Sequence, residues 1–434
     1  MMRSMYSGVS GLRIHQTKMD VIGNNIANVN TVGFKSSRVT FSEVFSQTLQ
    51  GASGASENSG GTNPMQIGLG ASISSIDVDM TEGAAQRTDN PLDLKIEGEG
   101  FFVVSDVTGN KFTRAGAFRI DEAGNLVNPD GLNVMGWYPD SNTGEIEKTK
   151  VVPLQILNAQ NMYVEPSMTT AVTLSGNINK NDPQILSAAG SPFTVNFYDS
   201  LGYKYTAEFQ ITCPDPTGAP NDFEITLDAD SVTDANGNTI QNDAMTGQLT
   251  FDPATGKVTS ATGFQIENLS TGFSQFPGAP DYLTIDASGL TMFSGNTTVK
   301  GAAGDADGLG SGNQAGAISG YEVGADGKIL GRYSNGETKL LGQIVIATFQ
   351  NPAGLQKIGA NLFTTTSNSG DFDGIGQDVT STGGSFNAGV LEMSNVDLSR
   401  EFTEMITTQR GFQANSRIIT SSDEMLQELV NLKR

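Results

Sequence analysis

The chain has 434 residues, enough for about two or three domains with their own hydrophobic cores. It carries 47 acidic against 25 basic side chains, a formal net charge of −22, which argues against nucleic-acid binding because phosphate contacts need a basic surface. With a single histidine, His15, and a single cysteine, Cys213, a metal site built from these residue types is close to excluded, and an internal disulfide is impossible.

The first predicted element is an amphipathic helix over about residues 3–29. Mostly apolar residues recur there at alternating steps of four and three, the pattern of a helix face that packs against another helix. An asparagine-rich run and a glycine then end the helix, because both residue types tolerate left-handed backbone. The expected packing face is Met5, Val9, Leu12, Met19 and Ile26, and the ending run contains Asn24, Asn25, Asn28, Asn30 and Gly33.

Residues 31–70 are expected to be a linker, because 51–64 has the Gly, Ser and Asn content of a flexible connector. The sequence has no run of about 18 apolar residues that could cross a membrane. The N-terminus also lacks the apolar segment and cleavage site of a secretory signal. We therefore expect a chain that is not membrane-inserted and that, if it is exported, leaves without a cleaved signal peptide.

The long middle of the chain alternates apolar and polar residues with a period of two, which is typical of half-buried strands. Turn sequences at 121–125 and 128–131 predict two closely spaced hairpins. The predicted organisation is an inner β domain over 71–146 and 293–365, interrupted by an outer β-sandwich or barrel over 147–292, with 366–395 as a connector to the C-terminal helix.

The C-terminal helix repeats the four-and-three pattern of the first helix. With 1–30, residues 396–434 are predicted to form a terminal coiled-coil assembly domain, in an α+β multidomain fold. Such a stripe can equally be a core face within one monomer, but polar residues in the series, such as Gln409 and Asp423, favour a crowded interface of several helices. The predicted face is Leu398, Phe402, Met405, Phe412, Ile419, Leu426 and Val430.

Candidate chemistry is sparse, and we expect neither enzymatic activity nor a cofactor. Two Asp-Gly clusters, 305–310 and 371–378, resemble calcium loops, but they lack the later ligands of an EF-hand, and Asp and Gly are also ordinary turn residues. Cys213 is expected to be a buried apolar side chain, with a reactive or cross-linked thiol as the alternative.

Three separated segments resemble the bacterial flagellar rod and hook axial protein family. They are 24–35 (NNIANVNTVGFK), which includes Phe34; 112–131, with FTRAGAFRID and GNLVNPDG; and the C-terminal stretch that begins at 391 (LEMSNVDL). The resemblance implies a structural, self-assembling protein whose paired ends line a hollow tube, with β domains outside. Within the family, one inserted β domain is typical of hook-forming members, whereas rod members are shorter.

For a hook-forming member, the resemblance implies a curved tube that acts as a universal joint and transmits torque from rod to filament. The implied location is the extracellular flagellar hook, reached through the type III export apparatus. The implied partners are further copies of the chain, the distal rod protein, the hook cap protein and the hook–filament junction protein. The alternatives are a distal rod protein of the same family and a secreted calcium-dependent adhesin.

Overall fold

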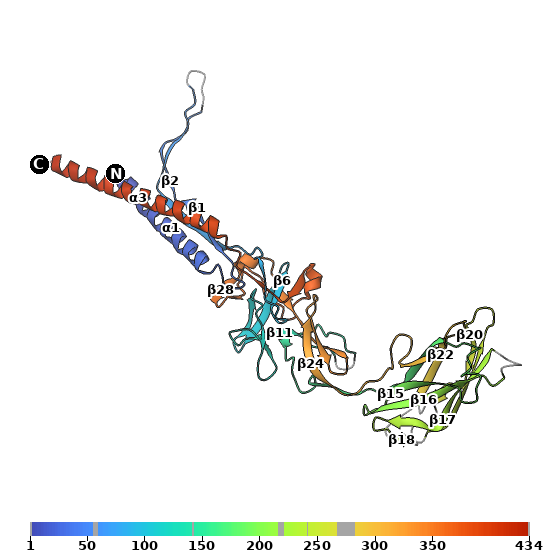
Figure 1. Cartoon of the computed structure of the whole chain (residues 1–434). Coiled ribbons are helices and arrows are strands. Elements are labelled where there is room, and N and C mark those ends of the chain that lie inside the picture. Colours follow the sequence, from blue (N-terminus) through green and yellow to red (C-terminus); the bar gives the residue numbers. More distant parts are fainter. Residues whose placement is uncertain are drawn as a thin grey trace. The chain divides into compact units, whose positions relative to one another are not determined.

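The computed structural model describes residues 2–54, 60–140, 143–215, 221–240, 242–266 and 283–432. The chain is mostly β, begins with helix α1 (Met2–Ala27) and ends with helix α3 (Leu398–Leu432), so the prediction of one helix at each end is confirmed (Figure 1). It divides into unit 1, residues 1–158, 321–331 and 340–434, and unit 2, residues 159–320 and 332–339. No helix among the described residues is long and apolar enough to cross a membrane.

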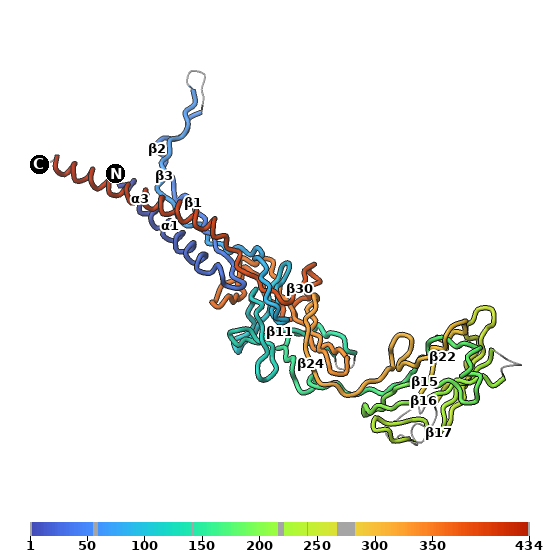
Figure 2. The backbone as a smooth tube through the Cα atoms, viewed as in Figure 1, coloured from blue at the N-terminus to red at the C-terminus, as the bar shows by residue number. Residues whose placement is uncertain are grey.

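Local signals set the helix ends, and the asparagine run and Gly33 end α1 as expected. After α1, the Asn28 amide nitrogen donates to the Asn24 carbonyl at 3.2 Å, and Gly33 has a left-handed φ of 68°. At the other end, Asp397 caps α3, because its Oδ1 accepts from the backbone nitrogens of Ser399 and Arg400. The two helices pack against each other within unit 1 (Figure 2).

Residues 31–70, expected to be a linker, contain three strands. Strand β1 (Ser37–Glu43) pairs with β4 (Ala71–Val78), and β2 (Ser46–Gln50) pairs with β3 (Met65–Gly68) in a hairpin that projects away from the helices (Figure 1). The β-branched and aromatic residues of 39–45 favour a strand, and the Gly-rich composition that predicted a linker belongs only to 51–64, between β2 and β3. Part of that loop, 55–59, lies outside the described residues.

The main sheet of unit 1 contains consecutive antiparallel neighbours in the order β26-β11-β7-β8-β29-β28. Trp137 and Phe112 lie in its core, packed with Phe101, Met135 and Phe363. Both predicted hairpins, β9–β10 and β10–β11, are confirmed. The strands of this sheet and those beside it are β26 (Thr338–Ile344), β11 (Asn133–Trp137), β7 (Phe101–Asp106), β8 (Gly109–Thr113), β29 (Leu362–Thr364), β28 (Gln356–Gly359), β9 (Arg119–Ile120), β10 (Leu126–Val127), β12 (Val152–Pro153) and β27 (Ile346–Ala347).

Two small pairings join the segment before α3 to the body of unit 1. Strand β5 (Ala85–Arg87) pairs with β31 (Val390–Glu392), and β6 (Leu94–Glu97) pairs with β30 (Ser385–Ala388). Because the last strand, β31, is paired with β5, the position from which the chain continues to α3 is fixed. Two short 3-10 helices, η1 (Pro352–Gly354) and η2 (Val379–Thr382), complete this part of the chain.

Unit 2 has two sheets that share one apolar core, to which Phe197, Phe209, Leu249 and Ile285 contribute. The six-stranded sheet comprises β15 (Ser191–Tyr198), β16 (Lys204–Thr212), β17 (Asp222–Asp234), β18 (Thr239–Ile240), β19 (Met245–Phe251) and β20 (Val258–Thr262). The four-stranded sheet comprises β21 (Gln265–Ile266), β22 (Leu283–Thr291), β14 (Ala171–Asn177) and β23 (Lys300–Ala303).

The boundaries of unit 2 fall later than the expected 147–292 at both ends. Strand β12 pairs with β11 and stays with unit 1, whereas β23 pairs with β14 and keeps residues after 292 in unit 2. Residues 267–282 of the expected insertion lie outside the described part. The remaining strands are β13 (Tyr163–Val164), β24 (Gly316–Val323) and β25 (Lys328–Tyr333), and the chain passes from one unit to the other within β24, β25 and β26.

Candidate assembly site at the two chain ends

The contact between α1 and α3 is built from small and polar residues. A Cβ atom added to Gly8 would lie 3.2 Å from Ile419 Cγ1, and one added to Gly411 would lie 2.8 Å from the His15 ring. Glycine thus lets the two backbones approach closely. The buried residues of the seam follow steps of three and four but are offset by one position from the predicted face of α1: Gly8, Gly11, Ile22 and Asn25 on α1, with Glu401, Thr408 and Ser422 on α3.

The predicted packing faces divide into two groups. Several of their residues flank the seam and are half-buried: Met5, Leu12, Met19, Ile26, Met405, Phe412, Ile419 and Leu426. The others are exposed: Val9, Leu398, Phe402 and Val430. An intramolecular helix pair therefore leaves part of both predicted faces uncovered.

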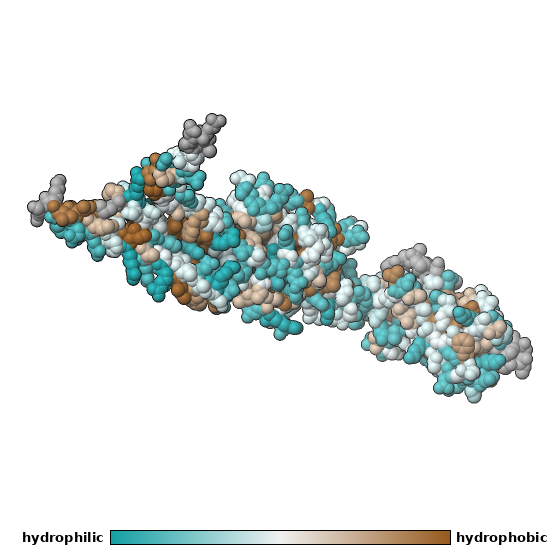
Figure 3. Space-filling model, turned by 90° about the horizontal axis from the view of Figure 1, so that it is seen from above, coloured by the Kyte–Doolittle hydropathy of each residue, from teal (hydrophilic) through white to brown (hydrophobic). Residues whose placement is uncertain are grey.

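More apolar residues of the helices are exposed than the sequence analysis singled out. On α3 they continue at helical spacing from Leu398 and Phe402 to Ile406, and again near the C-terminal end. Figure 3 shows apolar patches over the helical end of unit 1. A four-residue step continued from Leu398 through Phe402 would have predicted Ile406. The further exposed apolar residues of the two helices are Met2, Tyr6, Ile418, Met425, Leu429 and Leu432.

Polar contacts fix the alignment of the two helices. Lys18 Nζ lies 3.1 Å from Glu404 Oε2, and Asn25 Nδ2 donates to Glu401 Oε1 at 3.3 Å. Asn25 also donates to the Ser37 carbonyl, at 2.9 Å, and accepts from the Ser37 amide nitrogen, so it joins the helix pair to β1. Burial raises the pKa of Glu401, and the Asn25 hydrogen bond opposes that rise.

His15 lies inside this helix contact. Its Nδ1 atom is buried and has no hydrogen-bond partner among the described residues, and its ring lies edge-on to Phe41 at 6.3 Å between ring centroids. Burial, followed by the nearby charge of Lys18, lowers its pKa. The neutral imidazole is therefore the form that fits the seam.

Several residues of 24–35, the first segment that resembles the axial protein family, hold the N-terminal part of the chain in place. Asn28 Nδ2 donates to the Asn24 carbonyl at 2.9 Å, which closes the end of α1, whereas Asn30 is exposed. Phe34 is buried, with Lys357 Nζ 4.9 Å from its ring centroid. A Cβ at Gly33 would lie 2.6 Å from the Ala115 backbone nitrogen, so the chain passes very close there to the segment that follows β8.

A buried ionic cluster lies just beyond these residues, and sequence reasoning missed it. Lys35 Nζ lies 2.7 Å from Glu392 Oε1, and Arg114 Nη1 lies 3.7 Å from Glu392 Oε2. All three side chains are almost fully buried, so their charges are largely removed from water. Burial lowers the pKa of Lys35, while the Glu392 carboxylate works against that shift. Each of the three residues lies within one of the three segments that resemble the axial protein family, but only the fold brings them together.

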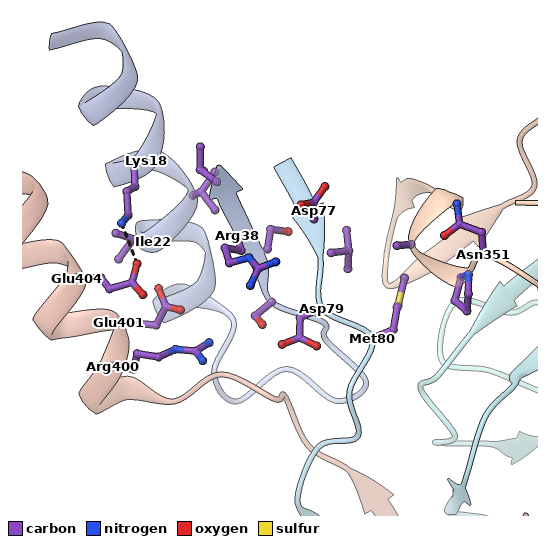
Figure 4. A pocket seen from close by; sticks show the side chains of 17 residues that line it. Lys18, Ile22, Arg38, Asp77, Asp79, Met80, Asn351, Arg400, Glu401 and Glu404 are labelled. Atoms are coloured by element: carbon purple, nitrogen blue, oxygen red, sulfur yellow. Dashed lines mark ion pairs between the residues drawn. The ribbon is translucent and has the colours of Figure 1, made fainter. Parts of the chain in front are cut away.

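A pocket of about 560 Å³ lies beside the helix pair (Figure 4). Its walls come from α1, α3, β1, β4 and η1, and charges of both signs line it. Figure 4 shows Arg38 and Asp79 near Glu401 and Arg400. This mixed lining, open to solvent, suits a polar protein contact better than a small apolar ligand. The labelled charged residues are Lys18, Arg38, Asp77, Asp79, Arg400, Glu401 and Glu404.

The Asp-Gly clusters act as turns in the structure. Asp305 Oδ1 accepts from the backbone nitrogens of Asp307 and Leu309, and Asp373 Oδ1 accepts from those of Ile375 and Gly376. Within the described part of the chain, no group of three or more His, Cys, Asp or Glu side chains is placed to hold a metal ion. Cys213 is buried, and burial raises the pKa of its thiol.

Comparison with known protein families agrees with this arrangement of the chain ends. Residues 5–35 match the model of the flagella basal body rod protein, 95–259 that of the flagellar hook protein FlgE/F/G D1 domain, and 387–432 that of the flagellar basal body rod FlgEFG protein C-terminal region. The chain belongs to this family of flagellar rod and hook proteins.

Full-length relatives place the chain among hook proteins. It is 38% identical to the flagellar hook protein FlgE of Borreliella burgdorferi and 36% identical to that of Treponema pallidum, in each case over 100% of both chains. It is also 33% identical to the flagellar basal-body rod protein FlgG of Bacillus subtilis, again over 100% of both chains.

Proposed function

We propose that this chain is a structural subunit of the bacterial flagellar hook and that it polymerises through its two terminal helices. Its family and its full-length relatives named hook protein support the assignment. The observation that carries the assembly mechanism is the apolar surface that the helices leave exposed after they pack against each other. The role is structural and non-enzymatic.

The uncovered face argues for helix partners in other copies of the chain. Phe402 is 50% exposed and Leu429 is 51% exposed, although both lie on a helix whose other side is already paired. Exposed apolar side chains repeated along one helix mark an interaction surface. Most of the fully buried seam positions are small or polar and the apolar residues beside them are only half-buried, so neighbouring helices would add apolar burial to that of the pair.

We infer a coiled-coil layer of terminal helices as the inner wall of the tube, with the β sheets of the chain outside it. The two sheets of unit 2 then form an inserted outer sandwich. The β2–β3 hairpin also exposes Phe45, Leu49 and Met65, as expected of an arm that docks on another copy.

The outer parts are suited to a tube that bends while it rotates. Sliding contacts between subunits need many weak, hydrated interactions instead of one apolar hot spot, and the chain is strongly acidic. We propose that the hook works as a universal joint between rod and filament. Its further partners would be the distal rod protein, the hook cap protein, the hook–filament junction protein and the type III export apparatus.

Electron microscopy of the polymerised protein tests the proposal. The full chain is expected to form curved hollow tubes, and a chain lacking 1–30 and 396–434 is expected to remain monomeric. Straight, rigid tubes would favour the rod alternative, for which the similarity to the Bacillus subtilis rod protein FlgG is the specific observation. Polymerisation of the truncated chain would contradict assembly through the helices.

A further inference from the structure

We propose that Lys35, Arg114 and Glu392 form a buried ionic latch that makes ordering of the N-terminal segment depend on docking of the C-terminal segment. The inference rests on the proposed function, because it concerns how the chain ends become competent to assemble. It assigns a specific role to three residues that lie far apart in the sequence.

The contacts of Glu392 place it at the centre of the latch. Its Oε1 atom accepts from Lys35 Nζ at 2.7 Å and from the backbone nitrogen of Gly83 at 3.0 Å. Its Oε2 atom lies 3.7 Å from Arg114 Nη1. Lys35 Nζ also donates to the Thr81 carbonyl at 2.6 Å, so its ammonium group is held on two sides.

Two cations share one buried carboxylate in this site, that of Glu392, and Glu82, the other carboxylate that acts on both cations, is partly exposed. Lys35 and Arg114 are both cations, buried close enough that each side chain faces the same carboxylate. Arg114 is held by its hydrogen bond to the Gly98 carbonyl, at 2.9 Å, and by its stacking over Phe101. If the carboxylate is removed, Lys35 is left as a buried cation beside a second one. Breaking one side of a buried ion pair is far more costly than breaking an exposed pair.

The latch lies at the base of both helices. Glu392 ends β31, shortly before α3 begins at Leu398, and Lys35 follows the segment that ends α1 at Ala27. The backbone nitrogen of Gly33 donates to the Glu392 carbonyl at 2.8 Å, and that of Ser36 donates to Asn395 Oδ1 at 2.8 Å. The N-terminal segment therefore rests directly on the C-terminal one.

The three residues come from three different family matches. Lys35 is the last residue of the match over 5–35, Arg114 lies within 95–259, and Glu392 lies within 387–432. The latch thus joins the two ends of the chain to the body of unit 1. A chain whose C-terminal segment is missing or undocked would leave the Lys35 segment without its counter-charge, and α1 without a fixed base.

Hydrogen–deuterium exchange of the full-length monomer tests the latch. Glu392→Gln keeps the shape of the side chain but removes its charge. We expect amide exchange to rise at least about tenfold both in 390–396 and in 28–37, because loss of one segment releases the other. Glu404→Gln, which breaks the partly exposed Lys18 pair, is the matched control and should leave 28–37 unchanged. Exchange in 171–212 reports that unit 2 remains folded.

A double-mutant cycle separates a latch from two independent effects. Lys35→Met and the double variant Lys35→Met/Glu392→Gln are compared with Glu392→Gln alone. The double variant should lose less protection in 28–37 than the sum of the single variants, because it contains no unpaired Lys35 charge. Additive losses, or exchange that rises only in 390–396, would overturn the latch. Microscopy of the wild-type polymer decides the proposed function separately, since the exchange experiment needs only the monomer.

Discussion

Gly33 shows how closely one residue can be constrained by its surroundings. Its φ of 68° is a left-handed conformation, and a Cβ there would lie 2.6 Å from one backbone atom of Ala115 and 2.9 Å from another. Backbone atoms cannot move aside as a flexible side chain can. A side chain at this position would therefore meet both backbone strain and a steric limit, next to the point where the N-terminal segment joins the latch.

Gly33→Ala is expected to destabilise unit 1 by about 3 kcal/mol or more. Gly131→Ala is the control, because Gly131 also has positive φ (82°) but nothing within 4 Å of the added Cβ. Its free energy of unfolding should fall only by the backbone strain, about 1 kcal/mol. Urea unfolding followed by fluorescence of the single tryptophan, Trp137, reports unit 1 for both variants. An equal loss of unfolding free energy in the two variants would show that the close approach to Ala115 does not matter.

His15 is the only histidine of the chain, so its titration can be followed without ambiguity. Burial and Lys18 lower its pKa from the ordinary value of 6.5, so the unfolded chain binds this proton more readily than the folded one. Its contribution to stability is therefore complete above about pH 6.5 and is lost as the pH falls below that value. Glu401, with a raised pKa, contributes in the opposite sense: its effect is present below its ordinary value of 4.5 and is lost as the pH rises.

We expect the imidazole proton resonance of His15 to titrate below pH 6.5 in the folded monomer. The helical signal in circular dichroism should be less stable to heat at pH 5.5 than at pH 7.5. His15→Gln, which cannot take up a proton in this range, should remove most of that difference. A pKa at or above 6.5 would mean that His15 is not enclosed by the helix contact.

At the scale of the elements, each of the two helices has one face that contacts the other helix and another face that is exposed. Gly8 and Gly11 lie against Asn415, and Gly411 lies against the His15 ring, while apolar residues such as Phe402 and Ile406 remain exposed. A helix that is apolar on a wide arc can serve an internal and an external contact together. The internal contact sets the alignment of the ends, and the external face is left for other copies.

Phe402→Asp should block polymerisation while leaving the monomer as stable as the wild type. The side chain is already exposed in the monomer, and a carboxylate near the start of α3 is compatible with the helix dipole. In a packed interface between copies the same charge would be buried without a partner. The critical concentration, measured by light scattering, is expected to rise roughly tenfold or more.

Thr407→Asp, exposed on the same helix, is the matched control and should polymerise much as the wild type does. The urea midpoint reported by Trp137 should be unchanged in both variants. If Phe402→Asp polymerises normally, the exposed face of α3 is not the assembly surface.

At the scale of the whole molecule, each unit has a core of its own. Trp137 belongs to the core of unit 1, whereas the core of unit 2 is built around phenylalanines such as Phe197 and Phe209. Residues of one core do not belong to the other, so each unit has its own source of apolar stabilisation.

Two unfolding transitions are expected for the monomer, because two separate cores seldom unfold as one cooperative unit. Trp137 fluorescence should follow only one of them, and circular dichroism of the strands should follow both. Gly33→Ala should shift the transition seen by Trp137 and leave the other in place. A single transition that is identical by both probes would contradict independent units.

Several features were predictable because their signals are local. The four-and-three pattern defines the two helices, and the asparagine run defines the end of the first, from neighbouring residues alone. Alternation in segments such as β19 likewise indicates a strand wherever it is placed. The β1–β4 and β2–β3 pairs were missed because the Gly-rich composition between them outweighed the short strand signals.

The sequence by itself determined that the chain ends are helices and the middle is β, because periodicity and capping act over a few residues. Tertiary structure decided which face of α1 meets α3, because close approach of the helix backbones selects the glycine side over the more apolar one. It also decided that Lys35, Arg114 and Glu392 share one buried site. No local pattern marks a counter-charge hundreds of residues away, and only the folded chain makes that pairing necessary.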